Sequence, residues 1–303
     1  MSMGSQSSFA IDTVLPLDGA STGIEIQSES LAKAGNIIET SGIRGTRQHV
    51  QERTRNGNYA IGGTIEMFPS PEELKIMLFW ITGTDHATVF TPAETVPSRV
   101  IGISRGGGTG GLGKCFTYGG CYVSRATIGG SEGEPMALSI ECIGQTETIE
   151  AAGAFATATV PMPAAGGSPF IFTDSSGAFY LGGNAIAVKS FSMTIDNLLD
   201  VAFNNSVSAS RITSADLAVS CSITTPYSTV NEVALYDKGV TGMALSAVFT
   251  HTLAYSLTIA GFFQPVSATP VINGKGEIVL RLDGMLRKTG STAAYTLTLD
   301  STP

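Results

Sequence analysis

The sequence predicts a mainly β protein made of two successive versions of one β-sandwich or barrel domain, each flanked by one α-helix. Three observations support this prediction. Polar and apolar residues alternate with a period of two along many short segments, helix signals are few, and the order of the segments repeats. Such alternation is typical of antiparallel strands with one buried and one solvated face. The 303 residues are enough for two ordinary domains.

Alternating segments occur throughout the chain. They are GIEIQ (23–27), GGTIEMF (62–68), ALSIECIG (137–144), SFSMTIDN (190–197), AVSCSITT (218–225), YSLTIAG (255–261), EIVLRLDG (277–284) and YTLTLD (295–300). We expect their small or acidic positions to form solvated strand faces, among them Glu66, Glu141, Ser192, Thr194, Ser220, Ser222 and Thr224. Arg281 is the main basic exception.

The strongest helix signal is SPEELKIMLFWITG. Ser70 is predicted as the N-cap and Pro71 as the first helical residue, while Glu73 completes a capping box and Gly83 ends the helix. Apolar residues, including Trp80, run nearly all the way round, so we expect this helix to be covered on more than one side. A weaker helix is predicted in STVNEVALYDKG, before Gly239.

The same order of segments occurs twice. An alternating strand leads to an arginine-containing stretch, a second strand, a proline, a helix ended by glycine and, later, a strand that closes on glycine. Between the two series lies EAAGAFATATVPMPAAGG, whose small residues and prolines are typical of a connector. We therefore predict one domain over residues 1–158 and a second over residues 159–303.

The composition narrows the class of partner. Charged residues make up only 14% of the chain, against roughly a quarter in an average soluble protein. The net charge is −8, and a chain this acidic does not bind nucleic acid through general attraction to phosphates. The N-terminus has no signal-peptide pattern and no apolar run is long enough to span a bilayer, so we expect no membrane anchor.

Neither a metal site nor a cofactor is predicted. The three histidines are scattered, and the four cysteines show no ligand spacing. Cys115 and Cys121 could flank a turn and pair, but without a secretion signal we expect reduced, structural thiols.

The glycine-rich stretch GISRGGGTGGLGKC (102–115) matches three enzyme motifs. Ser104 fits a nucleophile elbow, three of the glycines fit a dinucleotide fingerprint, and Lys114 ends a P-loop pattern. All three motifs require a helix directly after them, whereas KCFTYGGCYVSRATI is broken by glycine and typical of a strand. We therefore predict a flexible loop over residues 105–114 and no enzymatic activity.

The chain resembles the tail tube (major tail) proteins of long-tailed bacteriophages, in the form that carries two tube domains. The resemblance rests on SFSMTIDN, NNSVSASRIT, SCSITTPYSTVNEVALYDKGVTG and the final GKGEIVLRLDGMLRKTGSTAAYTLTLDSTP. It implies subunits that join into rings whose inner strands form one barrel, and rings that stack into a tube for the genome. A two-domain chain implies a trimeric ring with pseudo-sixfold symmetry. Further implied partners are the tape measure protein and the tail terminator and tip proteins, in a virion tail made in the bacterial cytoplasm.

In this family a long early loop reaches the adjacent ring, and the matching stretch here is residues 42–58. It holds Arg44, Arg47, Arg53 and Arg55, interrupted by Glu52. An inter-ring contact and a simple solvated loop are both open interpretations of this cluster, with nucleic-acid binding behind them because no aromatic residues are interleaved.

The predicted polar strand faces suit the bore of such a tube. A conduit for DNA must avoid holding phosphates, because each Lys or Arg contact adds a binding well. The seven small or acidic positions named above would therefore line the lumen. The alternative is a β-rich virion module that binds a receptor or glycan, but this needs an aromatic platform or aspartate clusters, and the sequence shows neither clearly.

Overall fold

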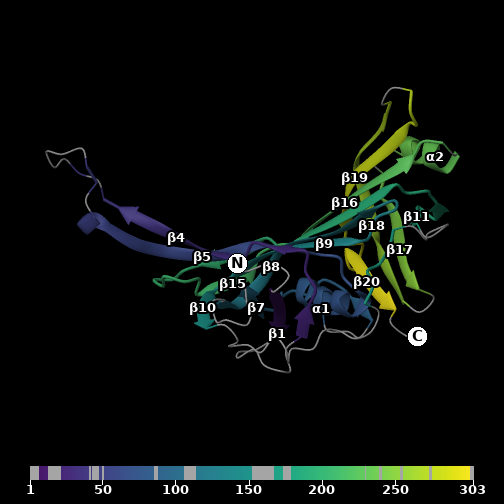
Figure 1. Ribbon diagram of the computed structural model, residues 1–303. Coiled ribbons are helices and arrows are strands. Elements are labelled where there is room, and N and C mark those ends of the chain that lie inside the picture. Colours follow the sequence, from purple (N-terminus) through teal and green to yellow (C-terminus); the bar gives the residue numbers. More distant parts are fainter. Residues whose placement is uncertain are drawn as a thin grey trace.

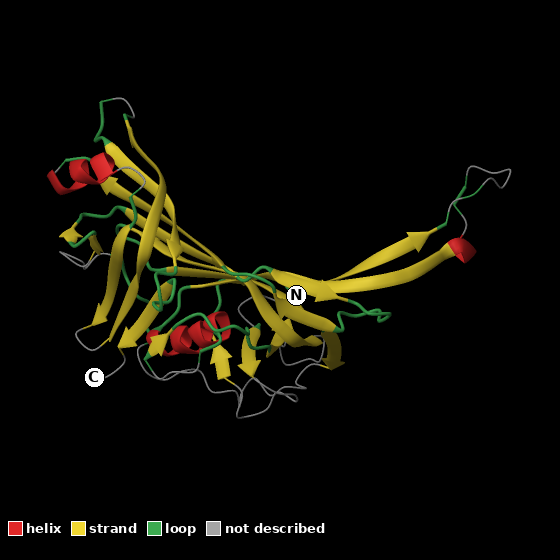
Figure 2. Cartoon of the chain, turned by 180° about the vertical axis from the view of Figure 1, so that it is seen from behind, coloured by secondary structure: helices red, strands yellow, loops and turns green. Residues whose placement is uncertain are grey.

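The computed structural model describes residues 7–12, 22–40, 42, 48–49, 51–84, 88–105, 114–151, 167–172, 179–228, 230–238, 241–252, 255–272 and 275–300. In this part of the chain, strands predominate and the helical elements are α1 (Pro71–Thr82), α2 (Val230–Lys238) and a 3-10 helix (Gln51–Arg53). Figure 2 shows this distribution, which confirms the prediction of a mainly β protein with few helices.

Eighteen of the strands are hydrogen-bonded into one antiparallel network, and β14 and β15 form a separate two-stranded sheet. The strands of the first half are β1 (Ser8–Asp12), β2 (Thr22–Ile24), β3 (Ser28–Glu29), β4 (Ala32–Glu39), β5 (Thr54–Met67), β6 (Val89–Phe90), β7 (Arg99–Arg105), β8 (Lys114–Ser131), β9 (Ala137–Gly144) and β10 (Thr146–Ala151). Those of the second half are β11 (Phe179–Leu181), β12 (Asn184–Ala185), β13 (Ser190–Asp196), β14 (Leu199–Ala202), β15 (Arg211–Ser214), β16 (Ala218–Pro226), β17 (Met243–Thr252), β18 (Tyr255–Val271), β19 (Val279–Arg287) and β20 (Tyr295–Asp300).

One row of strands runs through both halves, and we call it the long sheet. Its order is β3 with β4, then β5, β9, β8, β13, β16, β19 and β18, and every neighbouring pair is antiparallel. In Figure 1 the strands β1, β7 and β10 and the helix α1 lie together on one side of it. The long sheet therefore has one face covered by other elements.

The pairings around β8 and β18 follow the same pattern. The early part of β8 pairs with β7 and β10, and its later part pairs with β9, which in turn pairs with β5. The early part of β18 pairs with β17 and β20, and its later part with β19, which pairs with β16. A β-bulge lies in each long strand, between Val123 and Arg125 and between Pro265 and Ser267.

The two halves share one core. Strand β8 pairs with β13, β6 pairs with β20, and buried side chains from both halves form one continuous hydrophobic cluster. Buried Asn197 strengthens the junction because its amide donates hydrogen bonds to the carbonyls of Val123 and Ile81. The two sets of strands are therefore held together by backbone pairing, by packing and by a buried polar contact.

Helix α1 confirms its sequence prediction. The Ser70 hydroxyl accepts from the backbone N–H of Glu73, the Glu73 carboxylate accepts from the backbone N–H of Ser70, and Gly83 ends the helix in the left-handed conformation with φ 79°. None of its residues is exposed, as expected for a helix covered on several sides. Trp80 is completely buried, and its indole N–H donates to the carbonyl of Cys121 over 3.0 Å.

The structure corrects part of the long loop predicted over residues 42–58, of which residues 43–47 and 50 lie outside the described residues. Strands β4 and β5 form a two-stranded arm that extends away from the rest of the molecule (Figures 1 and 2), and β5 includes residues 54–58. The 3-10 helix directly precedes β5. The loop was expected from the resemblance to the family, but residues 54–58 pair with β4, and this pairing satisfies their backbone groups and makes them strand.

The structure contradicts the three enzyme motifs. Strands β7 and β8 are antiparallel neighbours, and Lys114 already belongs to β8, so no helix follows the glycine-rich stretch. Ser104 is buried within β7 rather than raised on a turn. Residues 106–113 of the predicted loop lie outside the described residues, whereas Arg105 and Lys114 are both in strands.

The cysteines are structural, as predicted. All four are free thiols and buried. Burial raises the pKa of both Cys142 and Cys221 to about 12, so that these thiols stay protonated and unreactive at neutral pH.

Candidate functional site

The seven predicted polar positions lie on one face of the long sheet, opposite the face that packs on the core. Residues directly opposite each other in an antiparallel pair have side chains on the same side. Glu66 is opposite Ser139, which is opposite Thr127, and Thr127 is opposite Thr194, which is opposite Ser220. This row therefore crosses five strands and both halves of the chain on one face, which we call the polar face.

Further rows run parallel to the first. In one, Ser192 is opposite Ser222, which is opposite Asp283. In another, Thr224 lies between Ser190 and Arg281. A third row consists of Thr64, Glu141, Arg125, Asp196 and Ala218. The sequence-predicted positions thus come together on one surface, with serine and threonine dominating its centre.

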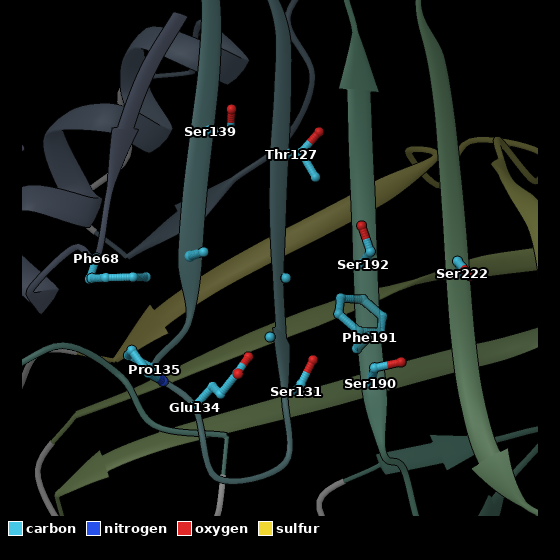
Figure 3. Close-up of a pocket in the computed structure, with 13 residues that line it drawn as sticks. Phe68, Thr127, Ser131, Glu134, Pro135, Ser139, Ser190, Phe191, Ser192 and Ser222 are labelled. Atoms are coloured by element: carbon cyan, nitrogen blue, oxygen red, sulfur yellow. The ribbon is translucent and has the colours of Figure 1, made fainter. Parts of the chain in front are cut away.

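The polar face is hollowed. One hollow of 670 Å³ is lined mainly by small residues of β8, β9 and β13, with Phe68 and Glu134 at its margin. Figure 3 shows that Ser139, Thr127, Ser192 and Ser222 come from adjacent strands of this wall. A second hollow of 380 Å³ is lined by Arg125, Asp196 and their neighbours. The face is thus concave, wide and open, unlike a pocket that encloses a small ligand.

The two arginines in the central rows are paired with carboxylates. The Arg125 guanidinium lies 3.0 Å from Asp196 and 3.6 Å from Glu141, and the hydrogen bond to Asp196 together with both charges raises the pKa of Arg125. Arg281 lies 3.0 Å from Asp283 on the same strand. These cations are therefore compensated before any phosphate approaches. A third arginine, Arg287, lies at the end of β19 and donates to the sulfur of Met285.

Hydroxyl groups make the contacts that link several strands of this face. The hydroxyls of Thr127 and Thr194 are 3.0 Å apart across the junction between β8 and β13. The Ser28 hydroxyl donates to the Glu66 carboxylate over 2.9 Å. At the centre of the face, between β8 and β13, the hydroxyls of Thr127 and Thr194 thus present an uncharged surface.

Sequence reasoning missed Arg125 as a member of this face. The bulge at Ser124 shifts the alternation of VSRATIGG by one residue, so a period-two pattern continued from Val123 gives the wrong side for everything after it. The sequence does carry one signal for the bulge, because the buried positions Cys121 and Val123 before it and Ala126 and Ile128 after it are out of phase by one residue.

The candidate inter-ring residues separate into two groups. Glu52, Arg53 and Arg55 are exposed at the far end of the arm, where His49 also contacts Glu39 over 2.6 Å. Arg44 and Arg47 lie outside the described residues. The described members thus lie on the part of the molecule farthest from the core (Figure 2).

The sequence of this chain matches the model of a family described as phage tail tube protein, over residues 3–286. The chain belongs to the phage tail tube protein family. It is therefore a non-enzymatic structural component of the virion tail, and such proteins self-assemble into tubes. No curated protein sequence is significantly similar to it.

The longest helix among the described residues, α1, has 12 residues, and neither it nor α2 is long and apolar enough to cross a membrane. Among the same residues, no three His, Cys, Asp or Glu side chains gather in a way that could hold a metal ion.

Proposed function

We propose that this tail tube protein forms trimeric rings in which the polar face lines the bore and the rings stack into the conduit for the genome. The observation that carries the proposal is the continuity of the polar face across both halves of the chain, with its central arginines neutralised. A single sheet that crosses the whole molecule is suited to become part of a larger closed barrel.

The pseudo-sixfold symmetry of this ring follows from two tube domains per chain, over residues 1–158 and 159–303. The matching pairings around β8 and β18, each with a bulge and each associated with one helix, support the duplication. Six similar sets of strands in three chains would surround the bore. In this ring, β8 and β13 form the junction between domains inside each chain.

The polar face suits the passage of DNA for an electrostatic reason. Each unpaired cation that reaches a phosphate releases counterions and adds affinity, which slows a sliding polymer. Here Glu66, Glu141 and Asp283 lie among hydroxyls, and the central arginines already have carboxylate partners. Acidic positions on this face repel phosphates and uncharged hydroxyls do not attract them strongly, so the DNA remains free to move.

The arm suits contact between successive rings. It projects from the body, and it carries both the charged residues Glu52, Arg53 and Arg55 and the exposed apolar residues Ile37 and Ile38. Apolar side chains that are 67% and 50% exposed are best explained by a protein surface that covers them in the tube. Contacts of the finished tube with tape measure, terminator and tip proteins belong to the same proposal.

Cysteine labelling of assembled tubes tests the orientation of the polar face. Ser220→Cys places a thiol on the polar face, and Tyr236→Cys places one on the exposed side of α2. We expect both variants to react with a maleimide-linked protein as free subunits, but only Tyr236→Cys to react after assembly, because the bulky reagent cannot enter the bore. Electron microscopy of the same tubes gives the rotational symmetry. Equal labelling of Ser220→Cys in subunits and tubes would contradict the proposal.

A further inference from the structure

Two edges of the long sheet have a strand on one side only. Among the described residues, β18 beyond its bulge pairs with β19 alone, and β3 with β4 pairs with β5 alone. Each of residues 32–40 is exposed, and Val266 and Ile272 at the other edge are 64% and 70% exposed. Open strand edges are templates for pairing with another chain.

We propose that these two edges pair with each other between copies of this chain, in one defined antiparallel register. In this register Ala34 of one copy lies opposite Ser267 of the next copy, and Leu31 lies opposite Pro270. The proposal rests on the proposed function, because it describes how the rings of the tube close.

The register comes from the junction that the chain already contains. There β8, beyond its bulge, pairs with β13 so that Arg125 lies opposite Asp196. Ser267 in β18 is equivalent to Arg125 in β8, because each is the first paired residue after the bulge. Each also lies opposite an acidic residue, which is Asp283 for Ser267 and Glu141 for Arg125. The open edge of β18 is therefore equivalent to the edge of β8 that binds β13.

The other edge is aligned by the same reasoning. Thr64 is opposite Glu141, and Ser222 is opposite Asp283, so these two residues are equivalent. Ala34 is opposite Ala60, which precedes Thr64 by four positions. Asp196 is opposite Ala218, which precedes Ser222 by the same number. Ala34 therefore takes the place of Asp196, and pairing it with Ser267 repeats the geometry of the internal junction.

Backbone chemistry at one position supports this register independently. Pro270 has no N–H. The hydrogen bond from Tyr227 to Ile278 makes Thr225 and Leu280, two residues further along, a hydrogen-bonded pair, so the backbone groups of Leu280 point toward β16. Pro270 lies opposite Leu280 on its other side, and its nitrogen and carbonyl therefore point toward the open edge. Its proposed partner, Leu31, has a carbonyl that already accepts from the Arg105 guanidinium over 2.6 Å and from the Tyr118 hydroxyl over 3.1 Å. The residue that cannot donate thus faces a carbonyl that needs no further donor.

The backbone N–H of Leu31 is satisfied as well, by the carboxylate of Glu29 over 2.9 Å. Arg105 holds that carboxylate in a bidentate pair with both distances at 2.8 Å. A shift of two residues would place Pro270 opposite Lys33 or Glu29. A residue with an N–H would then lie opposite Leu31, whose carbonyl and N–H already have their own partners. The side chains around this edge therefore select one register.

Paired cysteines in assembled tubes test the register. In the internal junction the bonds from Asn197 to Ser124 and from Glu132 to Lys189 make Thr127–Thr194 and Arg125–Asp196 non-hydrogen-bonded pairs. Such pairs have Cα atoms about 4.5 Å apart, within the range of roughly 4.4–6.8 Å for disulfides. Ala34→Cys/Ser267→Cys should therefore cross-link neighbouring chains on mild oxidation and give dimers and larger species in non-reducing electrophoresis.

Two variants serve as controls. Ala32→Cys/Ser267→Cys, two residues out of register on the same face, should give no more linked chains than either single variant. Thr127→Cys/Thr194→Cys should form a disulfide within one chain and show that the conditions oxidise this geometry. The four native thiols are buried and should not compete.

The outcomes separate the register from the proposed function. Absence of rings or tubes in electron micrographs of the unmodified protein would contradict the proposed function itself. If tubes form but the Ala32→Cys/Ser267→Cys variant cross-links as efficiently as the Ala34→Cys/Ser267→Cys variant, only the proposed register is overturned. Where a double variant does not assemble, the strand register in a high-resolution reconstruction of unmodified tubes decides, and any pairing other than Ala34 with Ser267 would overturn the proposal.

Discussion

The set of strands around β8 and the set around β18 share their pairings but differ in everything attached to them. The first set carries α1, which has a complete capping box and no exposed residue, and the long arm. The second carries α2, with Val233 37% and Tyr236 48% exposed, and only the short β14–β15 hairpin between its first two long strands. Sheet pairing thus tolerates large changes in helices and insertions.

The physical reason is that the two kinds of structure depend on different features of the sequence. Backbone hydrogen bonds and alternation specify a strand, and many residues satisfy both requirements. A buried helix needs side chains whose shapes fit their surroundings, so its stability depends on individual residues. We therefore expect substitutions in the buried helix of the first set to lower the free energy of unfolding more than matched substitutions in the second set.

The largest effect is expected in the helix of the first set. Trp80→Ala removes a fully buried ring and its hydrogen bond to Cys121, and should lower the free energy of unfolding by about 3–5 kcal/mol. Tyr236→Ala, the matched change on α2, should alter it by no more than about 0.5 kcal/mol because the side chain is half exposed. Urea denaturation of free subunits measures both values. Comparable losses for both variants would show that the two helices contribute equally.

An intermediate effect is expected at the helix cap. Ser70→Ala removes the acceptor for the Glu73 N–H and a donor to its carboxylate, and should cost about 0.5–2 kcal/mol. Ser70→Thr retains the hydroxyl and serves as the control, with a loss no larger than half that of alanine. Thermal unfolding followed by circular dichroism compares the two. An unchanged midpoint for Ser70→Ala would mean that packing alone determines where α1 begins.

The smallest effect is expected on the polar face, where the first set has an arginine with two carboxylate partners and the second has Arg281 with one. Arg125→Gln should cost at most about 1 kcal/mol, because its guanidinium is half exposed and solvent screens the pair. Arg281→Gln should cost less. A double-mutant cycle of Arg125 with Asp196→Asn, repeated at high salt, isolates the pair energy. A coupling well above this range would show that the ion pair is a principal link between the two sets.

The sequence predicted individual elements well where the signal is local. The alternation gave the strands from 190 to 196 and from 218 to 225 and their polar sides, and the capping residues gave α1 from Ser70 to Gly83. It was less accurate for β5, because residues 54–58 owe their strand structure to backbone pairing with the preceding strand β4 and not to an alternation of their own. It did not identify Arg125 on the polar face, because a bulge reverses the alternation there.

By itself, then, the sequence determined the class of fold, the thiol state and the polar character of one strand face. These follow from composition and from neighbours a few residues apart, to which hydrophobic burial and backbone geometry respond directly. Only the tertiary structure decided that strands from both halves join into one sheet, that two edges of that sheet stay open, and that arginines on its polar face meet carboxylates. Those features depend on registers between segments far apart in the sequence, such as β8 with β13 and β6 with β20, which local patterns do not encode.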